Sequence, residues 1–264
     1  MTTSQLLPAI AATAAIFATS NVIAQPAQQQ QQQQGPAPVV ELLACTFNNG
    51  KDMGDLRSAS NEFNAWADQN AVTDYTALTM TPYAFSEQVN YDTVWLGAWP
   101  NGTAMGADEA KWFATGAKAL AALEGVSDCG TRALFAVVPI HAPAGPPPER
   151  NGLTMFQDCK IREGRTPAEA IAALRQWTDY MGGRGGAAGL DAIMFPLAGK
   201  SSEADYTFKH VHAFGSIEEL GRGIDLYTTG GVQMQNQMLG RVMSCDSARI
   251  YTTERVRTAA QQGQ

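Results

Sequence analysis

The sequence predicts an α+β protein built from two consecutive copies of one βαββαβ unit. One observation is a repeat: Cys-Thr-Phe-Asn-Asn-Gly-Lys-Asp, starting at Cys45, corresponds to Cys-Lys-Ile-Arg-Glu-Gly-Arg-Thr, starting at Cys159. A second is that Cys129 in the first copy corresponds to Cys245 in the second. Matched positions lie 114 to 116 residues apart, which is typical of a duplicated unit of about a hundred residues.

The first copy contains four predicted strands and two predicted helices. Apolar residues three and four apart, from Leu56 to Trp66, predict the first helix. Pro82 and Pro100 end the second and third strands. The expected order is strand 39–47, helix 51–68, strands 76–81 and 93–99, helix 108–123 and strand 131–138.

The second copy repeats this order. Thr166 and Pro167 supply an N-cap and a first-turn proline for its first helix, and Pro196 corresponds to Pro82 as a strand end. The expected order is strand 154–161, helix 166–181, strands 192–195 and 206–214, helix 217–227 and strand 249–253. We therefore place the first copy at 39–142, a Pro-rich joining segment at 143–153, the second copy at 154–257 and a tail at 258–264.

The segment before the first copy indicates export. An Ala-rich apolar run precedes Val22-Ile23-Ala24, small residues at the positions that a signal peptidase reads. We expect residues 1–24 to be a cleaved signal peptide, with an uncleaved anchor as the alternative, and the run is short for a membrane span. Residues 25–38, rich in Gln and Pro, form a predicted linker. The mature protein is then periplasmic or secreted, with no stable membrane span.

Four cysteines in an exported chain indicate disulfides. The βαββαβ order is the split βαβ pattern of ferredoxin-like folds, in which the first and fourth strands are antiparallel neighbours. The cysteines fall at the end of one and the start of the other in each copy. We predict Cys45–Cys129 and Cys159–Cys245, each closing a loop of about 85 residues that stabilises the fold by roughly 4 to 5 kcal/mol.

Charge and motifs exclude several classes of function. The formal net charge is -7 without a run of Lys or Arg, which argues against a nucleic-acid partner. The sequence has no Cys-x-x-Cys for zinc, no P-loop and no Gly-x-Ser-x-Gly elbow. We predict no metal site.

The third strand of each copy carries the best candidates for a site. Alternation puts aromatic residues and histidines on one face of the aligned strands and small aliphatic residues on the other. The aliphatic face suits packing under helices, so we expect the aromatic and histidine face to line a common cavity between the sheets. These candidates are Trp95 and Trp99 in the first copy and His210, His212 and Phe214 in the second.

With this element order, duplication and third-strand pattern, residues 39–257 resemble the dimeric α/β-barrel superfamily, which includes antibiotic-biosynthesis-type and haem-degrading monooxygenases, EthD-like proteins and the chlorite dismutase group. The resemblance implies two ferredoxin-like sheets closed into an intrachain pseudo-dimer. Some haem-degrading members use an Asn, a Trp and a His together, and Asn48 with Trp95 or Trp99 could supply two of these. Their His lies on a helix, and no predicted helix here has one. Haem is compatible with the resemblance, but the motif is incomplete and we predict no cofactor.

Three functions remain open. The first is binding of a small, largely apolar molecule in the barrel interior, against Trp95, Trp99, Phe214 and Asn48. The second is a cofactor-independent monooxygenase- or isomerase-like enzyme in which His210 and His212 move a proton. The third is a non-catalytic structural or assembly module with a filled barrel, in which the histidines and tryptophans are core residues and Asn48 belongs to a turn. The sequence does not determine any further oligomerisation.

Overall fold

The computed structural model describes residues 35–87, 89–142, 148–186 and 189–260. The predicted signal peptide, residues 1–24, lies outside them, as does most of the predicted linker, 25–38. In the part that is described, no helix is long and apolar enough to cross a membrane.

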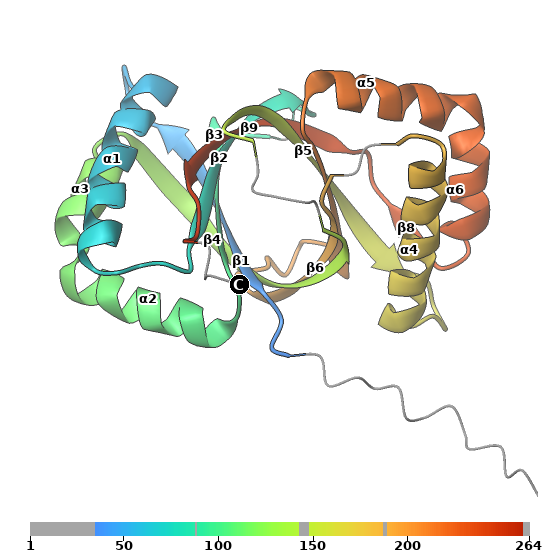
Figure 1. Ribbon diagram of the computed structural model, residues 1–264, viewed down its shortest axis with the longest axis horizontal. Helices are drawn as coiled ribbons and strands as arrows, with labels where there is room; N and C mark the ends of the chain where they lie inside the picture. The colour runs from blue at the N-terminus through green and yellow to red at the C-terminus, as the bar shows by residue number, and fades with distance from the viewer. Residues whose placement is uncertain (1–34, 88, 143–147, 187–188, 261–264) are drawn as a thin grey trace, which may run out of the picture. The chain divides into compact units, whose positions relative to one another are not determined.

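Within these residues there are nine strands, of which eight close into an antiparallel barrel (Figure 1). The strands are β1 Val39–Phe47, β2 Thr76–Ala84, β3 Thr93–Trp99, β4 Ser127–His141, β5 Arg150–Ile161, β6 Asp191–Ala198, β7 Phe208–Phe214, β8 Met243–Cys245 and β9 Arg249–Arg257. Their order around the barrel is β7-β6-β4-β1-β3-β2-β9-β5, and β5 pairs back to β7. The short β8 pairs with β5. The predicted α+β class is confirmed.

Helices cover the outside of the barrel in two groups (Figure 1). The first group is α1 Met53–Gln69, α2 Gly102–Thr115 and α3 Ala117–Glu124. The second is α4 Pro167–Gly183, α5 Ile217–Leu226, the π-helical turn η1 Tyr227–Gly231 and α6 Val232–Met238. Thr166 caps α4, as the sequence predicts, and Asp52 caps α1, each in a capping box.

The two halves of the chain contribute four adjacent barrel strands each, in the same order. The first half has β4-β1-β3-β2 and the second has β9-β5-β7-β6. The halves join through the pairs β2–β9 and β4–β6. Strand β4 is longer than predicted because its first part pairs with β1 and its last part with β6. Strand β5 begins earlier than predicted, at Arg150, within the segment assigned to the joining region.

The helix predicted over residues 108–123 is two helices. The first begins earlier, where the Asn101 side chain accepts from the backbone N–H of Ala104 at 2.9 Å. The two are separated at Gly116, where a Cβ would lie 2.4 Å from the Trp112 ring. A turn at this glycine directs α3 along α1, so the first half has three helices above its sheet.

The barrel interior is filled by one cluster of apolar side chains that includes every barrel strand and no helix. Its buried members are Val40, Met80, Val94, Phe135, Val137, Phe156, Ala192, Met194, Val211 and Tyr251. Separate clusters lie between the outer faces of the strands and the helices. The packing is therefore layered, with helices, sheet, interior, sheet and helices in turn.

Both predicted disulfides, Cys45–Cys129 and Cys159–Cys245, are confirmed. Cys159 lies directly opposite Cys245 in the β5–β8 pairing. Cys45 lies at a shift in the β1–β4 register. Each disulfide ties the first strand of its half to a later strand, which is the barrel strand β4 in the first half and the short β8 in the second.

Candidate functional site

The tryptophan and histidine faces of β3 and β7 point away from the barrel interior, which corrects the sequence-based assignment. The alternation along both strands is as predicted, but the other face, with Val94 and Val211, forms the interior. The barrel interior is packed with its own apolar side chains, and the tryptophan and histidine faces lie towards the helices instead. The predicted common cavity is therefore wrong, because the two groups of candidates line different cavities, one in the first half and one in the second. Trp95 and Trp99 line the first, and His210, His212 and Phe214 line the second.

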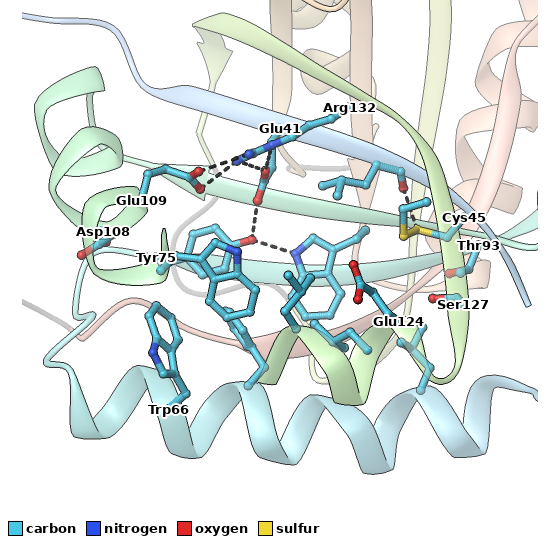
Figure 2. A pocket seen from close by; sticks show the side chains of 18 of the residues that line it. Glu41, Cys45, Trp66, Tyr75, Thr93, Asp108, Glu109, Glu124, Ser127 and Arg132 are labelled. Carbon is cyan, nitrogen blue, oxygen red and sulfur yellow. Dashed lines mark hydrogen bonds and ion pairs between the residues drawn. A yellow bond between two sulfur atoms is a disulfide. The ribbon is translucent and has the colours of Figure 1, made fainter. Parts of the chain in front are cut away.

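The first cavity lies between the outer face of β1 and β3 and the helices α1 to α3, and its volume is about 480 Å³ (Figure 2). Its walls are largely aromatic. Phe63 of α1 lies edge-on to Tyr75 and Trp95, with ring centroids 5.7 Å and 5.3 Å away. The aromatic residues that line the cavity are Phe63, Trp66, Tyr75, Trp95, Trp99 and Trp112.

A chain of hydrogen bonds crosses one wall of the first cavity (Figure 2). Trp95 Nε1 donates to Tyr75 Oη at 2.7 Å, and Tyr75 Oη donates to Glu41 Oε1 at 2.7 Å. Arg132 Nε donates to Glu41 Oε2 at 2.8 Å, and its Nη2 lies 2.7 Å from Glu109 Oε1. Burial raises the pKa of Glu41, and the Arg132 charge and the Tyr75 hydrogen bond only partly oppose this. The wall thus holds a fixed, buried carboxyl group.

Gly97 gives this network the space it needs. A Cβ at this position would lie 2.2 Å from Tyr75 Oη and 2.5 Å from Glu41 Oε1. Gly97 also lies opposite Glu41 in the β1–β3 pairing. The glycine within an aromatic strand therefore marks a close approach of neighbouring side chains.

The second cavity lies between the outer face of β5 and β7 and the helices α4 to α6, with a volume of about 660 Å³. Apolar side chains make up much of its wall, including Trp177, Phe214 and Leu220. Residues 246–248, which interrupt the strand between β8 and β9, also border it. A polar group, centred on Asp191, lies on the strand side.

Asp191 is 2% exposed and contacts three polar side chains. Its Oδ1 lies 2.7 Å from His210 Nε2, and its Oδ2 accepts from Thr178 Oγ1 at 2.5 Å. His212 Nδ1 lies 3.7 Å from the same Oδ2. Burial raises the pKa of Asp191, but the charges and hydrogen bonds of His210 and His212 outweigh it and hold the pKa well below its ordinary value. The ionised carboxylate therefore lies beside both imidazoles.

Sequence reasoning identified the histidines but missed Asp191 and Glu41, because neither was assigned to the face of the candidates. A signal for Glu41 exists: it is the one charged residue in the apolar strand Val-Val-Glu-Leu-Leu-Ala, and buried carboxylates are rare unless paired. Asn48 is not among the residues that line either cavity. It lies in the turn after β1, where its Nδ2 donates to the backbone oxygen of Glu124 at 2.8 Å.

The closed antiparallel barrel with a helical layer on each side, here completed within one chain, is a fold shared with solved structures of the dimeric α/β-barrel superfamily. No protein-family model matches the sequence, and no curated protein does so either. The likeness is therefore one of structure.

Three solved structures illustrate the likeness. A candidate monooxygenase from Fusobacterium nucleatum has a TM-score of 0.56 and 8% identity, covering 88% of this chain and 98% of its own. A candidate monooxygenase from Lactobacillus acidophilus has a TM-score of 0.51 and 11% identity, covering 85% and 97%. A mutant chlorite dismutase from Candidatus Nitrospira defluvii has a TM-score of 0.51 and 7% identity, covering 84% and 94%. At these identities the comparison establishes the fold alone.

Proposed function

We propose that the protein binds a small, largely apolar molecule in the second cavity. The observation that carries the proposal is a buried histidine–aspartate group on the strand side of a cavity of about 660 Å³ with many apolar lining residues. Small-molecule sites are typically roughly 300 to 1,000 Å³, apolar in most of their lining, and contain a few fixed polar groups. The filled barrel interior supports this location over the interior proposed from the sequence.

A second candidate function is proton transfer, as in a cofactor-independent isomerase- or monooxygenase-like enzyme. The geometry of His212 favours it. Its side chain is 16% exposed, against 6% for His210, so His212 is the imidazole that a ligand can reach. In this proposal His212 accepts a proton from the ligand, and the Asp191 carboxylate stabilises the imidazolium that results. His210 and Thr178 hold the carboxylate in position.

The proposal does not include haem. In the haem-degrading proteins that the sequence resembles, the histidine lies on a helix. The three histidines of this chain all lie on strands, His141 on β4 and His210 and His212 on β7. The residues present therefore do not fit that arrangement, and we derive no step through haem.

We further propose that the two halves are tandem ferredoxin-like repeats and that the mature chain is exported. The shared strand order and the equivalent disulfides support the first proposal. The two disulfides also support an oxidising compartment, and residues 1–24 have the composition of a signal peptide.

Native mass spectrometry of protein purified from an oxidising periplasm tests ligand binding. We expect an added mass that is retained in His141→Gln, a replacement of the exposed histidine, and reduced in His212→Gln. Urea unfolding of both variants checks that each is folded. If the added mass is equally abundant in all three proteins, the second cavity is not its site. Once the molecule is identified, its turnover by the wild type and not by folded His212→Gln would distinguish catalysis from binding alone.

A further inference from the structure

We propose that the first cavity is a second, separate binding site and that it takes an organic ammonium ion with an apolar body. The ligand class is an alkyl or arylalkyl amine, which is protonated at neutral pH, or a quaternary ammonium compound. Three observations carry this inference: the aromatic walls, an excess of carboxylates, and two buried polar atoms that lack partners in the described part of the chain.

The aromatic walls provide favourable surfaces for a cation. Four of the five tryptophans of the chain line this one cavity, together with Phe63 and Tyr75. Indole faces attract ammonium groups more strongly than other aromatic faces because of their ring quadrupole. The same rings also accommodate the apolar part of a ligand. An aromatic lining alone would suit a neutral molecule as well, so the charges decide between the two.

Carboxylates outnumber cations around the first cavity. The acidic residues that line it are Glu41, Asp108, Glu109, Glu124 and Asp128, whereas Arg132 is the one lining cation among the residues that the structure describes. Arg132 pairs with both Glu41 and Glu109. In the described part of the chain, neither Glu124 nor Asp128 forms an ion pair. The cavity therefore has an uncompensated negative charge, which favours a cationic ligand over a neutral or anionic one.

Two buried polar atoms in the lining lack hydrogen-bond partners among the described residues. Asp108 is 8% exposed; its Oδ1 accepts from Lys111 at 3.1 Å, but its Oδ2 has no partner. Trp99 is 4% exposed and its Nε1 has none. Buried polar groups are rarely left unpaired, because losing water without a replacement costs free energy. The Asp108 oxygen suits a cationic nitrogen, either a protonated amine that donates an N–H or a quaternary ammonium that is attracted by charge alone. The Trp99 N–H suits an acceptor elsewhere on the ligand.

The second cavity does not share this charge pattern. Its lining contains Asp191 and Asp246 but also Arg162 and the two histidines. The Asp191 carboxylate is already held by His210 and Thr178. The two cavities should therefore select different ligands, and this inference does not depend on the proposed function of the second.

The test uses benzyltrimethylammonium and its uncharged carbon isostere, neopentylbenzene, titrated into the full mature protein and followed by tryptophan fluorescence. The two probes have nearly the same shape and differ in charge. We expect the cation to bind about tenfold more tightly than the isostere, a difference in the range of a cation–π contact with carboxylates nearby.

Two double variants separate a local effect from a general one. Glu124→Gln with Asp128→Asn removes two exposed lining carboxylates and should weaken the cation about fivefold while leaving the isostere unchanged. Glu163→Gln with Asp179→Asn makes the same change in net charge at exposed residues outside the lining, and should change neither affinity. His212→Gln should also leave cation binding intact. Equal binding of both probes, no binding of the cation at millimolar concentration, or an equal loss in both double variants would overturn the proposal.

Discussion

Each half carries one buried carboxyl group on the outer face of its sheet, Glu41 in the first and Asp191 in the second. The two groups lie at the same level along the strands but on opposite sides of the middle strand, which is β3 or β7. Cys45 lies opposite Thr93 and Cys159 lies opposite Phe208, so positions in the two halves can be matched by counting along the strands. The matched rows are Glu41, Gly97 and Ala77 on β1, β3 and β2, and Met155, His212 and Asp191 on β5, β7 and β6. The two halves share the same strand pairing, but the acidic residue stands on a different strand in each half.

The difference in position determines the partners of each carboxylate. Glu41, on β1, reaches Arg132 of the neighbouring β4 and Tyr75, which requires a glycine in the middle strand. Asp191, on β6, reaches the histidines of β7. The same architecture thus produces an arginine-bound carboxyl in one half and a histidine-bound carboxylate in the other. In this protein a few positions on the outer faces of the strands therefore set the chemistry of each half.

Removing a disulfide should reduce the stability of the protein more than any other change proposed here. Comparing the two removals tests whether the two halves depend equally on their disulfides. Replacing both Cys45 and Cys129 by Ser, or both Cys159 and Cys245, should lower the free energy of unfolding by about 4 kcal/mol. The losses should be similar because the bridged cysteines are 84 and 86 residues apart. Urea unfolding, followed by circular dichroism, measures both. A large loss for one pair alone would show that the halves are not energetically equivalent.

A smaller effect is expected where the halves differ most, at Gly97. The variant Gly97→Ala should lower the free energy of unfolding by about 2 kcal/mol, since an added methyl group forces the surrounding side chains to shift. Its Cβ would overlap Tyr75 Oη and Glu41 Oε1. Urea unfolding gives the loss, and Gly102→Ala, at a glycine with open space around its Cβ, is the matched control. Equal stabilities of the two variants would contradict the steric account.

The smallest effect concerns pH, for which the two carboxyl groups should act in opposite directions. The pKa of Asp191 is lowered from 3.8 in the fold, so its contribution to stability is present above that value and is lost as the pH falls. The pKa of Glu41 is raised from 4.5, so its contribution is present at low pH and is lost as the pH rises through the folded value.

Urea unfolding between pH 6 and pH 3 measures these contributions. On acidification Asp191→Asn should lose about 1 kcal/mol less stability than the wild type by pH 3. Glu41→Gln should lose more than the wild type, because it lacks the gain that protonation of Glu41 provides. If the two variants change in the same direction, at least one of the two pKa shifts has the wrong sign.

Local patterns predicted much of the fold. Strands 39–47 and 93–99 have the predicted bounds, and the repeat predicted both disulfides. The long β4 could not be predicted in the same way, because its final part pairs with β6, which is distant in sequence. The break at Gly116 depends on the packing of Trp112 and was equally hidden from a one-dimensional pattern.

The candidate site was predicted less completely. Period-two alternation correctly grouped Trp95 with Trp99 and His210 with His212, but alternation does not say which face is inside a closed barrel. Side-chain size does not decide it either, because Phe135, Phe156 and Tyr251 lie in the interior. Val94 and Val211 lie in the interior, whereas Trp95 and Trp99 lie beneath helices. Asp191 was missed because its relation to the histidines depends on the β6–β7 register.

The pairs β2–β9 and β4–β6 join both halves within one polypeptide, and this has a consequence for symmetry. In a barrel made of two identical subunits, every substitution appears twice, so both cavities must carry the same residues. Here positions 97 and 212 can change independently, and one cavity can have a histidine where the other keeps its glycine. Both cavities are also present at any protein concentration, because no association step is needed to complete the barrel.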